Sequence, residues 1–165
     1  MAYIYLSLGT NIEPKKLNIL NALNQIKEKI SIIDLSPPYM SDPVGFESSS
    51  IFINLVLKGK TDLKPYKLLE YLKETELKLG RKSTNYVTDR IIDIDIIFYE
   101  DAVINSVNLT IPHPRARTRR FVLQPLYDIN KNIIFPDTKE TIIDLLKKVK
   151  TQKLSQIKSF YVENS

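Results

Sequence analysis

The sequence reads Thr88-Asp-Arg-Ile-Ile-Asp-Ile-Asp-Ile-Ile-Phe98 near the middle of the chain, and most of its interpretation starts from this segment. Residues two apart in a β-strand point to the same face, so we expect Asp93 and Asp95 to stand side by side with isoleucines on the other face. The flanking isoleucines and Phe98 make the run too apolar for a strand whose polar face simply meets water. We therefore predict a buried strand that carries two carboxylates near its start.

Two neighbouring carboxylates on an apolar strand need positive charge nearby, because burying an unpaired charge is costly. Arg90 is one candidate partner, and a divalent cation is another. Mg²⁺ is commonly held by one or two carboxylates together with substrate phosphates and water. The competing explanation is an edge strand whose carboxylates are solvated. The apolar flanks favour a Mg²⁺–nucleotide site at the mouth of a buried strand.

The composition of the 165 residues is that of an ordinary globular domain, with 26% charged and 43% hydrophobic residues. We expect a single domain over residues 1–165. No apolar run approaches the roughly 18 residues of a membrane span, and the N-terminus lacks the pattern of a secretory signal. The absence of cysteine excludes disulfides, cysteine-ligated zinc and a thiol nucleophile. These observations predict a cytoplasmic protein without a membrane partner.

Charge and histidine content narrow the chemistry further. The formal charge of +5 suits anionic partners, which include ATP as readily as nucleic acid. His113 is the only histidine in the sequence, so a metal site with several histidine ligands is excluded. It lies between two prolines beside a basic cluster at residues 115–120, so phosphate contact competes with a structural role for this side chain.

The hydrophobic pattern predicts the element order β-α-β-β-α-β followed by a C-terminal helical region. Strands are expected at residues 3–8, 32–39, 51–57 and in the opening segment, and helices at 14–30, 65–80 and 140–150. This is an α+β, ferredoxin-like arrangement, in which a four-stranded antiparallel sheet carries helices on one face. We expect long loops on the other face. The tail from about residue 151 is expected to be loosely held.

A polyphosphate would have to be neutralised without a glycine-rich loop, because the chain has four glycines and neither a G-x-x-x-x-G-K-[ST] nor a G-x-G-x-x-G motif. Arginine, which grips phosphate oxygens bidentately, is available at Arg81, at Arg90 and in the cluster Arg115-Ala-Arg-Thr-Arg-Arg120. Each group also has a plainer explanation. Arg81 can complement a helix dipole, Arg90 can pair with an aspartate, and the cluster can be a solvated face or a nucleic-acid patch.

Segments that resemble one family occur in that family's order and cover the chain to about residue 137. They are Tyr5-Leu-Ser-Leu-Gly-Thr-Asn11, Asp42-Pro-Val-Gly45, Phe52-Ile-Asn54, Glu76 to Arg81, Asp89-Arg-Ile-Ile-Asp-Ile-Asp95, and Leu109-Thr-Ile-Pro-His113 through Phe121-Val-Leu-Gln-Pro-Leu126. The combination of R-x-x-D-x-D with P-H-P-R is highly specific. On these motifs the chain resembles the 6-hydroxymethyl-7,8-dihydropterin pyrophosphokinases of folate biosynthesis.

The resemblance implies transfer of a pyrophosphoryl group from ATP to the hydroxymethyl oxygen of the pterin, with AMP as the second product. Asp93 and Asp95 match the positions that hold two Mg²⁺ ions. Arg81 and Arg90 match catalytic arginines that close on the phosphates with the loop at residues 81–89. The chain departs from many members at Val87-Thr-Asp89, where they have Trp-Gly-Pro before the arginine. We expect this change to affect ATP affinity and loop closure.

Two groups of substrate contacts follow from the same resemblance. The pterin would meet the side-chain amide of Asn54, a sandwich of two aromatic rings, and backbone groups of the loop that starts at residue 41. The expected pterin residues are Ser41, Asp42, Val44, Phe52, Asn54 and Phe121. The expected nucleotide residues are Glu76, Arg81, Arg90, Ile96, Thr110, His113 and Arg119. On pattern alone, the favoured interpretation of Glu76 is the edge of an apolar helix face, and that of both phenylalanines is ordinary core.

Two other functions compete with the enzyme. One is a basic ferredoxin-like module that binds RNA through its sheet and its arginines, although no RNP-type aromatic motif supports it. The other is a two-metal phosphodiesterase, which usually gathers more carboxylates or histidines than this chain places near Asp93. The resemblance favours the enzyme, acting as a monomer on small molecules, ATP and the pterin, and not on nucleic acid.

Overall fold

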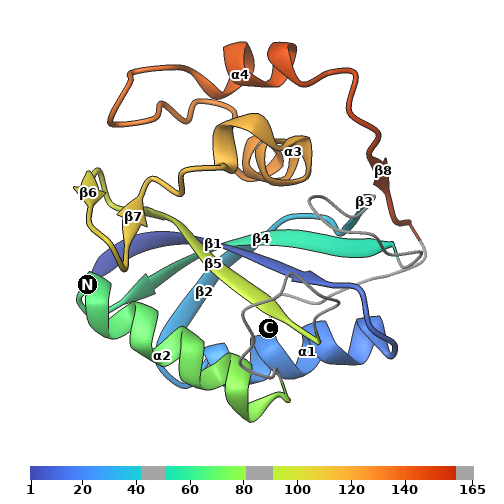
Figure 1. The fold of residues 1–165 in the computed structure, drawn as a ribbon, viewed down its shortest axis with the longest axis vertical. Coiled ribbons are helices and arrows are strands. Elements are labelled where there is room, and N and C mark those ends of the chain that lie inside the picture. Colours follow the sequence, from blue (N-terminus) through green and yellow to red (C-terminus); the bar gives the residue numbers. More distant parts are fainter. Residues whose placement is uncertain (42–50, 81–90, 159–165) are drawn as a thin grey trace.

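The computed structural model describes residues 1–41, 51–80 and 91–158 (Figure 1). The strands are β1 (Ala2–Thr10), β2 (Ile30–Leu35), β3 (Tyr39–Ser41), β4 (Phe52–Thr61), β5 (Asp93–Tyr99), β6 (Ile104–Asn105), β7 (Thr110–Ile111) and β8 (Ser155–Gln156). The helices are α1 (Lys15–Ile26), α2 (Pro65–Lys78), α3 (Arg120–Ile129) and α4 (Ile142–Lys148), with a 3₁₀ turn η1 (Ala116–Thr118). Within these residues no helix is both long and apolar enough to cross a bilayer.

The main sheet is antiparallel and has the strand order β5-β1-β4, with β2 and β3 end to end along the other edge of β4. β4 therefore lies between β1 and β2, and β1 lies between β4 and β5. These are two interleaved split β-α-β units, the ferredoxin-like order that the sequence predicts. β2 ends at Leu35 and β3 begins at Tyr39, because Pro37 and Pro38 interrupt the extended segment between them.

Helices α1 and α2 pack on one face of the sheet, as the sequence predicts (Figure 1). Their apolar residues, among them Ile19 and Leu72, join Leu6 and Leu57 of the strands in one buried cluster. The predicted first helix was too long at its C-terminus. It ends at Ile26, residues 27–29 form a turn, and Ile30 starts β2 opposite Thr61. The apolar spacing carried on across the turn because Ile30 faces the same core.

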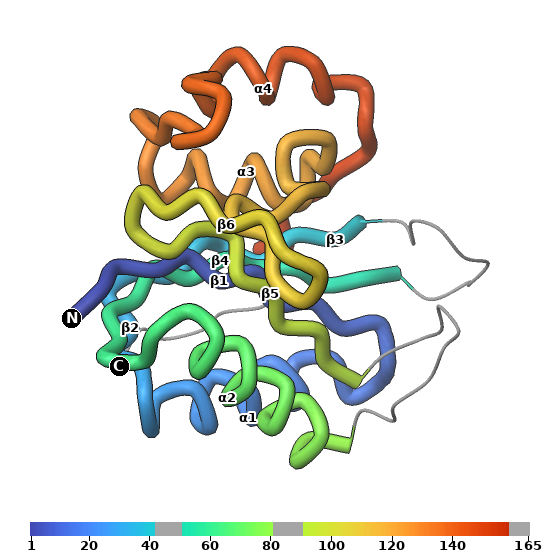
Figure 2. The backbone as a smooth tube through the Cα atoms, turned by 60° about the vertical axis from the view of Figure 1, so that its left-hand side comes forward, coloured from blue at the N-terminus to red at the C-terminus, as the bar shows by residue number. Residues whose placement is uncertain are grey.

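The second face of the sheet is covered by α3, on which α4 packs from the side away from the sheet, and this corrects our expectation of long loops there (Figures 1 and 2). Val122 and Leu126 of α3 pack with Val56 of β4 and Phe98 of β5 in a second buried cluster that also contains Leu145 of α4. The sheet is thus buried between two helical layers. Residues 155–156, within the tail that the sequence predicts to be loosely held, form β8 and pair with β3.

A β-bulge in β5 determines which residues face α3. Tyr5 pairs with Phe98 and Leu6 pairs with Ile96, so Ile97 is an extra residue between two pairs. Ile94 and Ile96 point into the α1–α2 core, whereas Ile97 and Phe98 both belong to the α3 cluster. By the alternation before the bulge, Asp93 and Asp95 share the α3 face. The side-by-side carboxylates predicted from the sequence are confirmed.

Candidate active site

One cross-strand row brings the predicted pterin and metal residues onto the same face. Tyr39 pairs with Asn54, Asn54 pairs with Gly9, and Gly9 pairs with Asp93. Directly paired residues on neighbouring strands project to the same side of a sheet. Asn54 and Asp93 are therefore two strand spacings apart, about 10 Å, with a glycine between them. Gly9 has no side chain that would stand between the amide and the carboxylate.

The Asn54 amide is buried, with 3% of the residue exposed, and its position is defined on two sides. Its Nδ2 donates a hydrogen bond of 2.7 Å to Oγ of Ser41 on β3. On the other side, a Cβ atom at Gly9 would lie 3.0 Å from its Oδ1. From the family resemblance we expect only backbone groups near Ser41 to meet the substrate, and Gly9 has no expected role. A glycine inside a strand is the signal that indicates such a close approach.

The two aspartates form an electrostatically demanding pair. Asp95 lies two residue pairs further along β5, opposite Ser7. The pKa of Asp95 is raised to about 7, mainly by burial and secondly by the negative charges of Asp93 and Glu76. The described residues contain no cluster of three or more histidine, aspartate or glutamate side chains that could hold a metal. Two carboxylates that need added positive charge nevertheless fit Mg²⁺, which takes its other ligands from phosphates and water.

Glu76 of α2 is buried, with 2% of the residue exposed, and reaches the edge of the sheet. Its Oε2 accepts a hydrogen bond of 2.7 Å from the main-chain N–H of Ile94, and its Oε1 lies 3.4 Å from Nζ of Lys73. Among the described strands β5 is the terminal one, so its outer N–H groups need partners from elsewhere. Glu76 supplies one of them directly between the two aspartates.

His113 lies at the same outer edge of β5, in the segment that follows β7. Its main-chain N–H donates to the carbonyl of Ile97 at 3.0 Å, and its Nδ1 accepts from the N–H of Arg115 at 3.2 Å. The pKa of His113 is lowered to about 4, mainly by burial and secondly by the positive charge of Arg119. The ring is therefore neutral near pH 7 and carries its proton on Nε2. That atom is 3.9 Å from Oδ2 of Asp95.

The start of α3 contributes a cation and an aromatic ring. Arg119 immediately precedes the helix, and its guanidinium carbon lies 5.4 Å from the ring centre of Phe121. Phe121 and Phe52 are both only partly buried, and α3 covers the face onto which Phe52 projects together with Asn54. Partial exposure distinguishes these two rings from fully buried core residues such as Phe135.

Of the remaining predicted site residues, two lie within the described parts of the chain and four do not. Thr110 belongs to β7, next to the segment that carries His113, and is half-buried. Ile96 is buried in the α1–α2 core, so a nucleotide could meet only its main chain. Arg81, Arg90, Asp42 and Val44 lie outside the described residues. The structure thus brings together Asn54, the aspartates, Glu76, His113 and Arg119, and gives no position for the two loop arginines.

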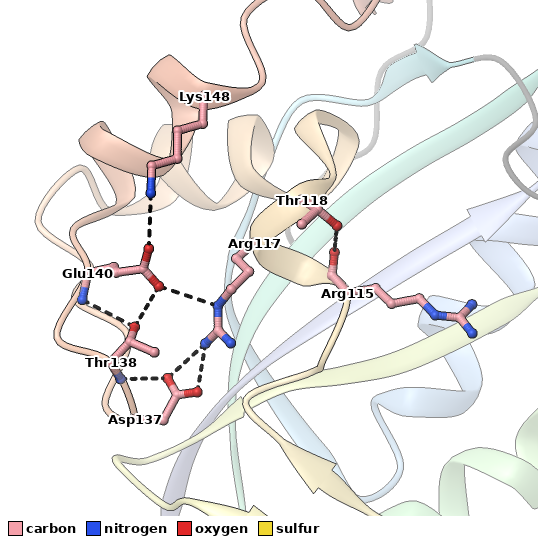
Figure 3. Close-up of polar contacts among 7 residues, drawn as sticks. All are labelled: Arg115, Arg117, Thr118, Asp137, Thr138, Glu140 and Lys148. Carbon is pink, nitrogen blue, oxygen red and sulfur yellow. Dashed lines mark hydrogen bonds and ion pairs between the residues drawn. The ribbon is translucent and has the colours of Figure 1, made fainter.

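The basic cluster at residues 115–120 does not form one continuous patch. Arg117 donates to both carboxylate oxygens of Asp137 at 2.8 Å, and its Nε lies 3.7 Å from Glu140 (Figure 3). Arg120 donates to the carbonyl of Gln152 at 2.7 Å. Arg115 points away from the ion pairs around Asp137 (Figure 3). Because Arg117 and Arg120 are engaged by residues that precede and follow α4, and α3 covers the sheet, this arrangement argues against the RNA-binding alternative.

Comparison with known proteins gives a consistent family. A family model described as 7,8-dihydro-6-hydroxymethylpterin-pyrophosphokinase (HPPK) matches residues 5–131. The 2-amino-4-hydroxy-6-hydroxymethyldihydropteridine pyrophosphokinase of Aquifex aeolicus is 41% identical over 136 residues, which cover 82% of this chain and 85% of that one. The protein of the same name from Haemophilus influenzae is 30% identical over 159 residues, which cover 95% of this chain and 99% of that one.

The fold also has a counterpart among solved structures. The crystal structure of wild-type HPPK-DHPS from Plasmodium falciparum matches with a TM-score of 0.73 and 20% sequence identity. The match covers 90% of this chain and 43% of the Plasmodium chain, so this chain spans less than half of that protein. At this identity the likeness concerns the fold alone. Together with the sequence matches, it confirms the resemblance predicted from the motifs.

Proposed function

Because the chain belongs to the 7,8-dihydro-6-hydroxymethylpterin-pyrophosphokinase family of folate biosynthesis, we propose that it transfers pyrophosphate from ATP to 6-hydroxymethyl-7,8-dihydropterin. The hydroxymethyl oxygen forms a bond to the β-phosphorus of ATP and gives up its proton to solvent. The bond from that phosphorus to the oxygen shared with the α-phosphate breaks, and AMP leaves. The observation that carries this proposal is the row in which Asn54 and Asp93 share one face with Gly9 between them.

The pterin binds at the Asn54 end of this row. One N–H and the oxygen of the Asn54 amide meet the donor–acceptor edge of the flat bicycle, while Phe52 and Phe121 contact its faces by offset stacking. Main-chain groups of Ser41, Asp42 and Val44 complete the edge. Support for this arrangement comes from the burial of Asn54 and from the partial exposure of both rings.

The nucleotide binds along the outer edge of β5. Asp93 and Asp95 are the residues that would hold two Mg²⁺ ions, which would supply positive charge against the triphosphate and lower the pKa of the attacking hydroxyl. The Nε2–H of His113 donates to a phosphate oxygen, and Arg119 adds positive charge. Arg81 and Arg90 are proposed to contact the phosphates from their loop. The other nucleotide contacts are Glu76, the main chain of Ile96, and Thr110.

The chain's own contribution is positioning and charge rather than covalent chemistry, as is usual in phosphoryl transfer. His113 is neutral near pH 7 because its pKa is about 4, but its unprotonated Nδ1 already accepts the main-chain N–H of Arg115. We assign no side chain as the general base. We further propose that the protein works as a monomer in the cytoplasm.

Two substitutions test this assignment in an AMP-release assay with ATP, Mg²⁺ and the hydroxymethyl dihydropterin. Asp95→Ala is expected to abolish turnover with the fold retained. Asn54→Ala is expected to raise KM for the pterin by at least about tenfold, because a buried amide partner is lost, and to leave KM for ATP unchanged. Full activity of Asp95→Ala contradicts the metal assignment. An effect of Asn54→Ala on KM for ATP alone contradicts the pterin assignment.

A further inference from the structure

We infer that the side-chain hydroxyl of Ser41 and the missing side chain of Gly9 are positioning elements that hold the Asn54 amide in the orientation that reads the pterin. This inference rests on the proposed function, because it concerns how the same site selects its substrate. Neither element needs to touch the substrate through a side chain of its own. Each acts through Asn54.

The Ser41 side of the amide is fixed by one hydrogen bond across two strands. Ser41 and Asn54 are on neighbouring strands β3 and β4 and are 13 residues apart in sequence. The bond from Nδ2 to Oγ is 2.7 Å long and both residues are buried. It occupies one of the two N–H groups of the amide. The second N–H and the oxygen remain, which is one donor and one acceptor for the edge of a ligand.

The Gly9 side of the amide is fixed by a close approach. A Cβ atom at Gly9 would lie 3.0 Å from Oδ1 of Asn54 and 3.8 Å from Cδ1 of Phe52. Gly9 lies within β1, where glycine is not a favoured residue, and its direct partners on either side are Asn54 and Asp93. A methyl group here would push the amide oxygen away from its place. The glycine is thus explained by what stands next to it.

Two contacts from opposite sides leave the amide little freedom. Without the Ser41 hydroxyl, rotation about the Cβ–Cγ bond of Asn54 is no longer opposed by a hydrogen bond. Ordering that rotation on binding costs free energy, and the freed N–H needs a new partner. Pterin affinity should therefore fall when Ser41 loses its hydroxyl, whereas ATP, which is bound at β5, should be unaffected.

The test compares pterin and ATP dissociation constants, measured by calorimetry on the full chain, for Ser41→Ala, Ser41→Thr and the wild type. Ser41→Ala is expected to bind the pterin roughly tenfold more weakly, the effect of one buried hydrogen bond. Ser41→Thr, which keeps the hydroxyl, should recover most of the affinity. Ser36→Ala is the matched control. Ser36 is also buried, but its hydroxyl bonds main-chain groups of Val56 and Pro37, so pterin affinity should not change.

A double-mutant cycle separates positioning from a general effect on the strand. In an Asn54→Ala background, Ser41→Ala should cause no further loss of pterin affinity. Gly9→Ala offers a second, independent cycle, because its clash is with Oδ1 and should disappear in the same background. The thermal midpoint of each variant reports whether it is folded, and Gly9→Ala carries the test if Ser41→Ala is not.

The possible results distinguish a failure of this inference from a failure of the proposed function. Equal pterin affinity of Ser41→Ala and the wild type overturns this inference, as does a tenfold loss that persists when Asn54 is alanine. Both results leave the proposed function intact. A wild-type protein that neither binds the pterin nor releases AMP overturns the proposed function, and the inference with it.

Discussion

The buried carboxylate of Glu76 accepts the main-chain N–H of Ile94 at 2.7 Å, midway between the two aspartates of β5. This contact ties α2 to the terminal strand that carries the predicted metal ligands. It also brings a third negative charge near Asp95, whose pKa is raised by burial, by Asp93 and by Glu76. Glu76 therefore has a structural role in the site in addition to the nucleotide contact proposed for it.

Substituting Glu76 should separate its hydrogen bond from its charge. Glu76→Gln keeps an oxygen for the Ile94 N–H, so we expect a small loss of stability and a lower pKa of Asp95. Glu76→Ala leaves a buried N–H unpaired and should reduce the free energy of unfolding by ~1–3 kcal/mol. Urea unfolding and carboxyl-carbon NMR titration measure the two effects. An unchanged pKa of Asp95 in Glu76→Gln would show that the two carboxylates do not interact.

The pH dependence of stability should report Asp95 directly. The pKa of Asp95 is raised from 3.8 to about 7 in the folded protein, so between these values the folded state binds more protons than the unfolded state. Its contribution therefore makes the protein less stable as pH rises towards 7. Asp95→Asn removes this effect and should be more stable than the wild type at pH 8, by ~1–2 kcal/mol in metal-free buffer.

Two controls accompany this measurement. The difference between Asp95→Asn and the wild type should shrink towards pH 4, and Mg²⁺ with a nucleotide should narrow it at pH 8 by stabilising only the wild type. His113 has a lowered pKa of about 4, so its own contribution rises with pH between about 4 and 6.5. Comparing the two proteins at each pH removes most of this opposing trend. A variant that is less stable than the wild type at pH 8 contradicts the account.

The hydroxyl of Tyr39 anchors β3 to α3 by donating a hydrogen bond to Oδ2 of Asp128. The other carboxylate oxygen of Asp128, Oδ1, accepts from Nε2 of Gln124 at 3.1 Å. The pKa of Tyr39 is raised, mainly by burial and secondly by the hydrogen bond to Asp128. Tyr39→Phe should lower the free energy of unfolding by ~1–2 kcal/mol, because Asp128 loses one of these two donors. Denaturant melts of Tyr39→Phe and of Gln124→Ala, which removes the other donor, test this. An unchanged free energy of unfolding in Tyr39→Phe would show that this hydrogen bond does not anchor β3 to α3.

Arg117 and Arg115 form a matched pair for testing the basic cluster. Arg117 is held by Asp137 and lies 4.9 Å from the ring centre of Phe135. Arg117→Ala should destabilise the fold by ~1–3 kcal/mol, whereas Arg115→Ala should leave stability nearly unchanged. Thermal unfolding distinguishes them. Equal stabilities, combined with salt-sensitive RNA binding that Arg117→Ala weakens, would instead support the nucleic-acid alternative.

Periodicity was sufficient to predict the strand of Asp93 and Asp95 and the helices on the first face. The second layer was harder, because α3 contains Pro125 in its interior. Proline removes a main-chain donor and disfavours a helix interior, so the segment gave no clear helical signal. The bulge at Ile97 is equally invisible in the pattern, since two consecutive apolar residues fit a core strand of any register.

The site shows the same division between local and non-local information. The family motifs predict Asn54 and His113 as substrate contacts. The structure places His113 beside the aspartate strand and Asn54 two strands away on the same face of the sheet. The bond between Ser41 and Asn54 depends on the register of β3 against β4, and the approach at Gly9 depends on the register of β1 against β4. Neither register follows from composition or spacing. These contacts could be found only once the strands were placed.

The most direct measurement of the central claim is ³¹P NMR of one complete reaction of the protein with ATP, Mg²⁺ and the hydroxymethyl dihydropterin. The account predicts AMP and a pterin diphosphate in equal amounts, no ADP, and no reaction with Asp95→Asn. ADP together with a pterin monophosphate, or inorganic phosphate without a pterin product, would contradict it.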